Sequence, residues 1–552
     1  MAYTKIPPYE EAAATHPRFV FILGFLALFV WFCRWVYQQA YGTDIDKIAG
    51  IPEPGGALPF YGHLKALGND HASKFQQWAI ENEWPVFQAK LGNRRIIVLN
   101  SFEVAQDYIV KNAGATIDRP LFYTFHSVLS KTQGGTIGTS PWDESCKRRR
   151  TAVGSIMTRP AILKSANMLD LEITALVRDL ESNSFRTVSE KGGRTSMEVD
   201  PRLHFQRMAL NLTLMMCFST RFDKLEDPML HELLDIALSV STFRSTNNNI
   251  QDYVPFYRYL PQNDRTKLAI ANRVKRDEIF GKLLDKVSRA LKEGKPLDCI
   301  SSGLLNEKGR LTDSEIRSVN VSLVSGGFET LSTTGLAGLG YLSSPQGQDI
   351  QARAFKAIME VYSSPEQAWS DCLQEERVPY IVALVREMLR YYAAIQLLPP
   401  RQTCKDFEWN GVTIPSKVAV YQNAQAINHD TTAYGPDSDQ FRPERWLEEN
   451  GTFKVGAPYH YSFGAGSRMC TAVALSNRIL YALFLRLILH FEFTASPTSS
   501  PSTHYVDLNE DTTGQTVIVK RYSISLKERF PRRSFLSNLE TSDLAAQTVH
   551  LV

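Results

Sequence analysis

The stretch Phe463-Gly464-Ala465-Gly466-Ser467-Arg468-Met469-Cys470-Thr471-Ala472 places one cysteine between a glycine-rich turn and the start of an apolar helical pattern. Glycines allow the backbone to turn tightly and to approach a ligand closely. The start of a helix and the free N–H groups of a turn favour a thiolate over a thiol. One thiolate beside Arg468 suits a metal centre that carries an anionic macrocycle. The alternative is a buried cysteine in a helix-capping loop, which is the commoner fate of a lone cysteine.

Three further motifs lie upstream of this loop. Glu387 and Arg390 are three residues apart on a predicted helix and share one face, although such a pair taken alone is an ordinary surface ion pair. The segment Phe441-Arg442-Pro443-Glu444-Arg445-Trp446 follows them. The third motif, Ser325-Gly326-Gly327-Phe328-Glu329-Thr330, lies half-way along a long predicted helix, where paired glycines are poor helix formers. The glycines leave room for a flat ligand or mark a packing kink.

Helical patterns dominate the chain, which predicts a mostly α fold with small β-sheets (α+β). Thr312-Asp313-Ser314-Glu315 has the form of a capping box, so a long helix is expected from there toward Leu336. Apolar residues recur at helical spacing in 378–392 and in 473–490. Short strands are expected at 86–89, 95–99 and 517–519.

The N-terminal segment predicts a membrane anchor. Residues 19–33 are apolar without a charge, and aromatic residues gather at the end of the run. A helix of about 20 residues spans a bilayer core, and aromatic residues are typical of its interface. We therefore expect a transmembrane helix over 18–37, after an N-terminal tail at 1–17. A cleaved signal peptide is the rival interpretation, but no small-residue cleavage site follows.

Composition divides the rest of the chain into three parts. Prolines and glycines in 38–60 predict a stiff linker that holds the body away from the membrane. Residues 61–526 contain no strong linker and predict one large domain. The polar segment 527–552 predicts a C-terminal tail.

Charge and cysteine usage exclude some classes of function. The 552 residues carry 61 Lys and Arg against 58 Asp and Glu, and the net charge of +3 indicates no nucleic-acid partner. The chief basic cluster, Lys147-Arg148-Arg149-Arg150, is typical of a solvated helix face. The seven cysteines are scattered without zinc-site spacing, which predicts reduced thiols in a cytosol-facing domain.

In their order along the chain, these motifs together resemble the cytochrome P450 monooxygenases. The resemblance implies that family's fold and a haem b (iron protoporphyrin IX) cofactor. It makes Cys470 the axial ligand of the haem iron, in a loop that includes Phe463 and Gly464. Such a ligand pushes electron density onto iron and favours O–O cleavage. The resemblance further implies that a buried salt-bridge network lies behind the haem and has a structural role; its members are Glu387, Arg390 and Arg445.

Arginines are expected to converge on the two haem propionates. By resemblance, Arg468 and Arg401 are candidates. Family members commonly carry a tryptophan four residues before an arginine, and aligning that segment here puts Cys146 at the tryptophan position. Arg150 is then the third candidate, with Arg149 as a possible substitute.

In the family, the site of Glu329 and Thr330 handles protons delivered to dioxygen, with the alcohol organising water. Such acid–base work needs a carboxyl within hydrogen-bond reach, directly or through one water. The alternative is a packing kink with a solvated glutamate. His429 is a weaker candidate for the haem site, and a helix- or loop-capping histidine is an equal alternative.

A narrower resemblance is to the fungal phenylacetate hydroxylases and related m-cresol-type hydroxylases, and it rests on residues 55–63, 119–126, 138–150 and 251–255. It implies a small aromatic acid, phenol or cresol as the substrate, in aromatic catabolism or secondary-metabolite biosynthesis. The expected pocket residues are Phe122, Phe125, His126, Phe328, Ile395 and Leu397. His126 and Arg119 either hold a hydroxyl or carboxylate of the substrate or are satisfied within the protein.

The leading hypothesis is a haem-thiolate monooxygenase that uses O2 and electrons from a separate NADPH–cytochrome P450 reductase. Basic residues near the cysteine would dock an acidic reductase surface. We expect a single-pass protein of the endoplasmic reticulum membrane with its catalytic domain in the cytosol. Three alternatives remain: a haem-thiolate isomerase or dehydratase that does not use O2, an oxidase of a larger polyketide or terpenoid, and a haem carrier. The acid–alcohol pair disfavours the first and the last.

Overall fold

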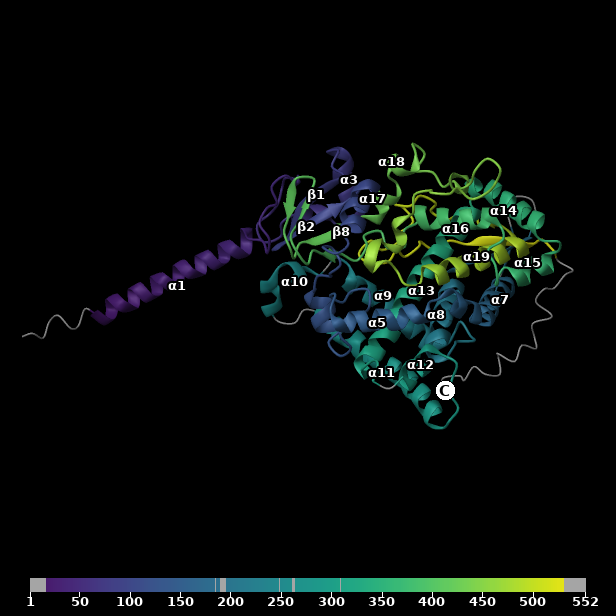
Figure 1. Ribbon diagram of the computed structural model, residues 1–552, viewed down its shortest axis with the longest axis horizontal. Helices are drawn as coiled ribbons and strands as arrows, with labels where there is room; N and C mark the ends of the chain where they lie inside the picture. The colour runs from purple at the N-terminus through teal and green to yellow at the C-terminus, as the bar shows by residue number, and fades with distance from the viewer. Residues whose placement is uncertain are drawn as a thin grey trace, which may run out of the picture.

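Helices build most of the body in the computed structural model, which describes residues 16–183, 185–188, 195–247, 249–260, 264–307 and 309–530 (Figure 1). The α-helices are α1 (His16–Tyr41), α2 (Leu64–Leu67), α3 (His71–Glu81), α4 (Phe102–Ala105), α5 (Glu144–Ile156), α6 (Arg159–Lys164), α7 (Ala166–Ser182), α8 (Arg202–Phe218), α9 (Pro228–Arg244), α10 (Ile250–Tyr253), α11 (Asp264–Lys292), α12 (Ile300–Asn306), α13 (Asp313–Ser343), α14 (Gln348–Val361), α15 (Pro365–Asp371), α16 (Pro379–Tyr391), α17 (Ala424–Asn428), α18 (Thr431–Tyr434) and α19 (Val473–His490). Short π- and 3₁₀-helices are η1 (Gln106–Lys111), η2 (Tyr123–Leu129), η3 (Pro255–Tyr259), η4 (Pro345–Gly347), η5 (Pro443–Trp446), η6 (Tyr461–Phe463) and η7 (Gly466–Arg468).

Small sheets lie at the edges of the helical body. The strands are β1 (Val86–Leu91), β2 (Arg94–Leu99), β3 (Phe185–Val188), β4 (Thr195–Val199), β5 (Arg401–Gln402), β6 (Phe407–Trp409), β7 (Val412–Ile414), β8 (Ala419–Gln422), β9 (Phe491–Ala495) and β10 (Ile524–Glu528). One sheet has the order β1-β2-β8-β5, in which β2 and β8 are parallel and the other pairs antiparallel. A second sheet has the order β3-β4-β10-β9, and β6 pairs with β7. The predicted α-rich α+β pattern is confirmed.

The long central helix α13 begins where its sequence predicts. Thr312 is the N-cap, and both halves of the capping box form, since the Glu315 N–H donates to Thr312 Oγ1 over 3.3 Å and the Thr312 N–H donates to Glu315 Oε2 over 2.9 Å. The helix passes the predicted Leu336 and ends at Ser343. It packs closely on α8, because a Cβ at Gly327 would lie 2.6 Å from Thr213 Cγ2.

The largest apolar core lies between α13, α8, α7, α16 and α19. Helix α19 spans the predicted 473–490 and is almost wholly buried, while α16 starts and ends one residue inside the predicted 378–392. The strands predicted at 86–89 and 95–99 are confirmed as β1 and β2. The strand predicted at 517–519 is wrong. The Val517 N–H donates to Ala394 O and its carbonyl accepts the Thr333 hydroxyl, so this segment bonds to neighbouring loops and helices rather than to a sheet.

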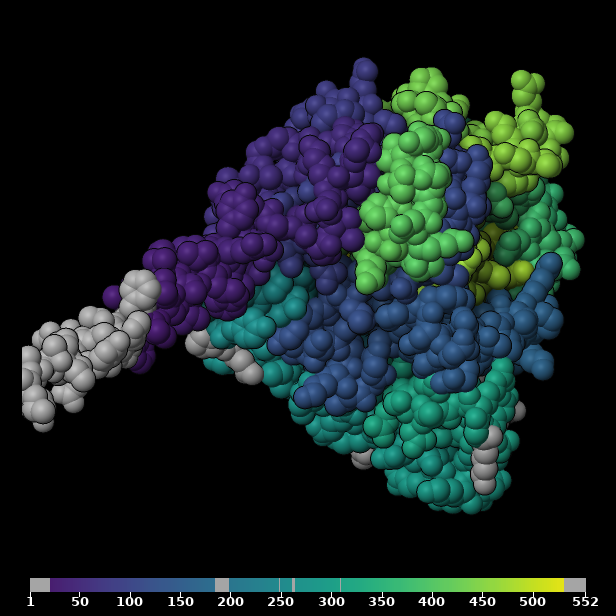
Figure 2. All heavy atoms as spheres, turned by 60° about the vertical axis from the view of Figure 1, so that its left-hand side comes forward, coloured from purple at the N-terminus to yellow at the C-terminus, as the bar shows by residue number. Residues whose placement is uncertain are grey.

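Helix α1 stands away from the body (Figures 1 and 2). Its stretch Val20–Tyr41 is long and apolar enough to cross a membrane, and its most apolar window buries nothing against the rest of the chain. It is a candidate transmembrane span and continues four residues past the predicted end at 37. Helix α19 is also long and apolar enough to cross a membrane, but it is mostly buried, as a core helix should be. Of the predicted tail at 1–17, residues 1–15 lie outside the described residues.

The segment predicted to be a spacer, 38–60, is instead partly helix and partly packed on the first sheet. Ile48 and Ile51 are buried, and the Gln88 side chain bonds to both of their backbones. Glu53 forms a 2.6 Å ion pair with Arg95. The prolines and glycines correctly predicted that the segment after α1 is not helical. The apolar residues Ile48 and Ile51, however, pack this segment on the body.

The far end of the chain also differs from its predicted boundary at 526. Strand β10 continues to Glu528 and pairs with β9 along its whole length. The Arg529 Nε then donates to Ile488 O over 2.9 Å and to Phe491 O over 3.0 Å. The body therefore extends at least to this arginine, and 531–552 lie outside the described residues.

Candidate active site

The cysteine loop is built from two short 3₁₀ turns, η6 and η7, joined at two glycines. Gly464 and Gly466 have φ angles of 68° and 62°, in the left-handed region that favours glycine. A Cβ at Gly466 would lie 3.1 Å from Ile109 O, so the loop also lies close to η1. The Cys470 N–H donates to Phe463 O over 3.0 Å, which closes the loop three residues before α19 begins.

Two groups place positive charge near the Cys470 sulfur, a backbone N–H and a guanidinium. The Ala472 N–H donates to Sγ over 3.4 Å, and Arg150 acts from further away. Cys470 is exposed to solvent, yet desolvation by the protein groups packed around its sulfur raises the pKa of the thiol, and these two groups oppose that effect. Coordination to a metal removes the proton of a thiol outright.

Four arginines gather beside the loop, from four separate parts of the chain. Arg119, Arg150, Arg401 and Arg468 bond only to backbone carbonyls in the described structure: Pro399 and Pro400 for Arg119, Ser467 and Met469 for Arg150, Ala465 for Arg401, and Ile117, Ile137 and Ser140 for Arg468. The Nε atoms of all but Arg150 are buried without a partner. Burial, and then repulsion from Arg468 and Arg150, lowers the pKa of Arg401 to about 9. Among the described residues no carboxylate forms an ion pair with these four arginines, although Asp118 acts on Arg468 from further away.

The structure thus brings together the three predicted propionate arginines and adds Arg119, for which a haem contact was not expected. Arg149 does not join them. Its guanidinium is buried on the other face of α5, where Nη1 donates to Ser318 Oγ over 2.6 Å. Half of the basic run 147–150 therefore faces inward, and only Lys147 and Arg148 are solvated.

The middle of α13 has open space beside Gly326. A Cβ at Gly326 would meet no atom within 4 Å, although the helix around it is largely buried. These features fit haem b, which needs an axial ligand, room for a flat ring and partners for two propionates. The thiol of Cys470 can be the ligand, the space beside Gly326 can take a ring, and the four arginines have no ion-pair partner among the described residues.

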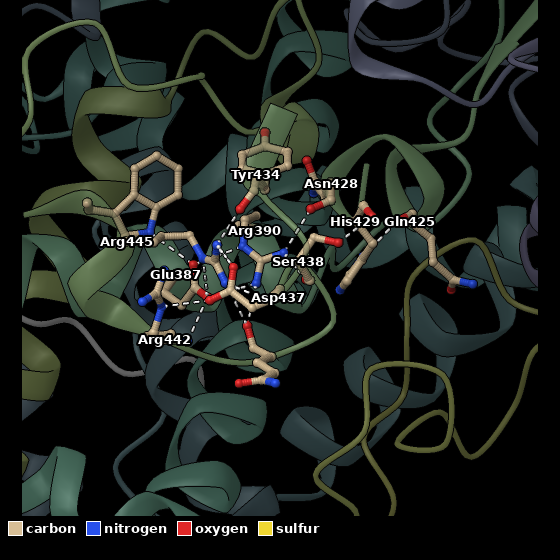
Figure 3. Close-up of polar contacts among 12 residues, drawn as sticks. Glu387, Arg390, Gln425, Asn428, His429, Tyr434, Asp437, Ser438, Arg442 and Arg445 are labelled. Atoms are coloured by element: carbon tan, nitrogen blue, oxygen red, sulfur yellow. Dashed lines mark hydrogen bonds and ion pairs between the residues drawn. The ribbon is translucent and has the colours of Figure 1, made fainter. Parts of the chain in front are cut away.

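Figure 3 shows the network around Glu387, Arg390 and Arg445, which lie in contact. Glu387 Oε1 accepts from Arg390 Nη2 at 2.7 Å and from Arg445 Nε at 3.0 Å, while Oε2 accepts from Arg390 Nε at 2.9 Å. The Arg442 N–H and the Trp446 indole complete the carboxylate's shell. Both members of the Glu387–Arg390 pair are fully buried, so this is not a surface ion pair.

This network connects to the cysteine loop through Asn428. Arg390 Nη1 donates to Asn428 O over 2.8 Å. The Asn428 side chain accepts the Tyr461 N–H at 2.7 Å and donates to Ser462 Oγ at 3.0 Å, at the start of the loop. The buried charges therefore hold the chain segment that presents Cys470. No local sequence signal marks Asn428 or Ser462 for this role.

The structure does not bring the acid and the alcohol of α13 together. Thr330 is half-buried, and its hydroxyl donates to Gly326 O over 2.8 Å. Glu329 is buried and turned away, paired with Arg244 Nη2 at 2.8 Å and accepting the Thr516 hydroxyl at 2.7 Å. Burial raises the pKa of Glu329, although Arg244 and Thr516 oppose it. Sequence analysis missed both partners, which are distant in the chain.

A cavity lies among η2, the end of α9 and the loop after α16. Its walls include four of the six predicted pocket residues, Phe122, Phe125, His126 and Leu397. The other two are not part of it: Phe328 is buried in the main core, and Ile395 packs beside the first sheet. The cavity also contains Arg119, Arg244 and Asp252, so its aromatic wall carries charged groups.

Two histidines bond to backbone groups of the protein, His126 through both ring nitrogens and His429 through Nδ1 alone, since its Nε2 is buried without a partner. His126 Nδ1 bonds to the backbone of Phe122, and its Nε2 lies 3.2 Å from Thr139 O. His429 is the C-cap of α17, stacks on Tyr505 at 3.6 Å, and has Nδ1 2.7 Å from Gln425 O. The capping alternative therefore describes His429.

Comparison with known proteins agrees with this geometry. A sequence model of the family described as cytochrome P450 matches residues 52–514. Phenylacetate 2-hydroxylase of Emericella nidulans is 39% identical over 493 residues, which are 89% of this chain and 92% of the relative. 3-Hydroxyphenylacetate 6-hydroxylase of the same organism is 35% identical, over 87% of this chain and 89% of the relative. Cytochrome P450 monooxygenase CYP3 of Mycosarcoma maydis is 30% identical, over 81% of each.

Proposed function

The chain belongs to the cytochrome P450 family as a monooxygenase, and on that premise we propose that it hydroxylates a small aromatic substrate, a phenol, a cresol or an arylacetic acid. The observation that carries the proposal is similarity to two relatives, 39% and 35% identical over most of both chains, whose names describe hydroxylation of arylacetates. The aromatic wall formed by Phe122, Phe125 and Tyr253 supports it, because flat apolar rings pack well on one another.

The chain's own residues supply the cofactor site. Cys470 would ligate the iron, and Arg119, Arg150, Arg401 and Arg468 would hold the two propionates of haem b. When bound, the haem supplies the activation of O2. The Glu387 network fixes the segment that carries the cysteine, so its role is structural. Phe463 and Gly464 shape the turn in front of the thiol.

Proton handling falls to α13. The Thr330 hydroxyl lies on the same face as Gly326, toward the open side of the helix, where it can order a water. Glu329 is the acid next to it in sequence, and it must leave Arg244 and Thr516 before it can exchange a proton there. Until then, the Glu329 carboxylate remains in its ion pair with Arg244.

The proposal extends to partners and location. Electrons would come from a separate NADPH–cytochrome P450 reductase, whose acidic surface would meet Lys147 and Arg148 on the outer face of α5. Helix α1 would anchor the protein by a single span in the endoplasmic reticulum membrane, with the body in the cytosol. The reaction would serve either aromatic catabolism or secondary-metabolite biosynthesis.

The first experiment is a reduced carbon monoxide difference spectrum of the wild type and of Cys470→Ser. A strongly red-shifted Soret band that the variant loses supports the haem thiolate. Turnover of phenylacetate, phenol and m-cresol with reductase and ¹⁸O-labelled O2 should then put one labelled atom into the product. Conversion of a fatty-acid hydroperoxide without O2 or reductase, and no label in any aromatic product, would instead favour the isomerase or dehydratase.

A further inference from the structure

Arg244, the last residue of α9, lies between the cavity and the central helix. Its Nη2 contacts both carboxylate oxygens of Glu329, at 2.8 and 3.0 Å, while the same residue forms part of the cavity wall. Its side chain is 13% exposed. Arg244 therefore connects the place where a ligand would bind with the acid on α13.

The polar groups next to Arg244 are already engaged. The Thr246 hydroxyl lies 2.6 Å from His71 Nδ1, and Asn247 Nδ2 donates to Asn69 O at 2.7 Å and to Thr512 O at 3.1 Å. Among the described residues that form the wall, the buried side-chain nitrogens and oxygens without a partner are Arg244 Nε and Arg119 Nε. A buried donor without an acceptor is costly, so an acceptor supplied from the cavity would stabilise either of these atoms.

The two arginines belong to different surroundings. Arg119 lies in the arginine cluster beside the cysteine loop, where Arg401, Arg468 and Arg150 all act on it. Arg244 is not among the charges that act there. Once the cluster is assigned to the propionates, Arg244 remains the cation available to a ligand in the cavity.

The negative groups of the wall are held elsewhere. Asp70 accepts the Ser73 N–H at the start of α3, and Asp252 accepts the N–H and the hydroxyl of Thr124. Burial raises the pKa of Asp252 to about 6, so this carboxyl is still mostly ionised at pH 7.

We propose that Arg244 binds the carboxylate of an aromatic acid substrate, and that this carboxylate competes with Glu329 for the guanidinium. The inference rests on the proposed function and narrows its substrate to an ionised arylacetic acid rather than a neutral phenol. A guanidinium presents a planar fork of donors that matches a carboxylate through two parallel hydrogen bonds. Nε and one Nη of Arg244 form such a fork, and Nε is unused.

Competition between the substrate carboxylate and Glu329 for Arg244 would affect proton delivery. A second carboxylate beside Glu329 brings like charges together, so the Glu329–Arg244 pair weakens when substrate binds. Glu329 then keeps only the Thr516 hydroxyl and becomes free to serve the proton exchange near Thr330. Substrate binding would in this way switch on proton delivery, and reduction without substrate would stay slow and uncoupled.

The test compares phenylacetate with its neutral isostere phenylacetamide on the full-length holoenzyme. Spectral titration of the Soret band gives the dissociation constant of each ligand for the wild type, Arg244→Gln and Arg265→Gln. Arg265 is a matched control, because it bonds to Thr242 O and stacks on Phe243 in the same region without forming part of the cavity wall. We expect the wild type and the control to prefer the acid by about tenfold or more, and Arg244→Gln to lose that preference while binding the amide unchanged.

A second readout separates this role from a structural one. Arg244→Lys keeps the charge but not the fork, so it should retain part of the preference for the acid. The fraction of NADPH that yields product should be higher with phenylacetate than with phenylacetamide in the wild type, and equal in Arg244→Gln. An unchanged acid preference in Arg244→Gln, or no preference in the wild type, overturns the inference. Absence of binding and product for every aromatic tested would instead overturn the proposed function.

Discussion

Replacing Glu387 by glutamine should lower the free energy of unfolding by about 3–5 kcal/mol, the range for removing one partner of a buried charge pair. Five donors converge on this carboxylate: three guanidinium N–H groups, one backbone N–H and one indole. A glutamine keeps the oxygen that accepts three of them. Its NH₂ group replaces the other oxygen and faces the Arg390 Nε and Trp446 Nε1 donors, so two buried donors lose their acceptor at about 1–3 kcal/mol each.

The measurement is equilibrium urea unfolding, together with the haem content from the Soret-to-280 nm absorbance ratio. Haem content should fall as well, because Arg390 and Asn428 hold the start of the cysteine loop. The matched control is Glu278→Gln, which breaks an exposed 2.8 Å pair with Lys282. That change should cost about 0.3–0.5 kcal/mol and leave the haem content unaltered.

The reasoning fails if the two glutamine variants have the same midpoint and slope in urea. Glu387→Asp refines the test, because it keeps the charge but shortens the reach by one methylene. It should fall between the wild type and Glu387→Gln. A loss for the aspartate as large as for the glutamine would mean that geometry, rather than uncompensated charge, dominates this site.

Three further predictions concern α13 and a buried histidine. Thr330→Ala should divert electrons to peroxide, measured as H₂O₂ formed per NADPH consumed, whereas a haem carrier would be indifferent. Gly327→Ala should lower the free energy of unfolding, measured by thermal melting, by about 1–3 kcal/mol because its Cβ would clash with Thr213, whereas Gly326→Ala should raise it by about 0.5–1 kcal/mol. Burial lowers the pKa of His429 from 6.5 to about 3, so the unfolded state binds the proton first on acidification. The stability present above pH 6.5 is therefore lost as pH falls, by up to about 1.4 kcal/mol per unit, and His429→Phe should flatten this loss in urea unfolding between about pH 7 and pH 5.5.

Features that depend on neighbouring residues were predictable from the sequence. The capping box at Thr312 and Glu315 needs only four consecutive residues, and it fixes the start of α13 where expected. Helix α19 was predicted to the residue because a buried amphipathic run is bounded by the loop on one side and by a strand on the other. The contact of Glu387 with Arg390 follows from their spacing by three on a helix.

Features that depend on distant segments were not predictable in this way. Residues 42–60 have the composition of a spacer, yet Ile48 and Ile51 find a partner in Gln88 about forty positions away and dock on a sheet. The segment at 517–519 has strand-like residues, but its backbone groups bond to Ala394 and Thr333. Local propensity states what a segment can form, and tertiary contacts decide among the options.

The separation of Glu329 from Thr330 is consistent with helix geometry. It implies that, in the proposed mechanism, the Glu329–Arg244 pair would loosen before a proton is transferred. Successive residues on an α-helix point about 100° apart, so an acid and an alcohol next to each other in sequence start out on different sides of the helix. Thr330 is four residues from Gly326 and shares its open face, whereas Glu329 is turned toward Arg244 and Thr516. Their adjacency in the sequence suggested that Glu329 and Thr330 act together at one site, but the fold turns Glu329 toward a different side of α13. In the proposed mechanism a proton would reach the open face from Glu329 only after its ion pair with Arg244 loosens, so a ligand that binds Arg244 from the cavity would also control the acid.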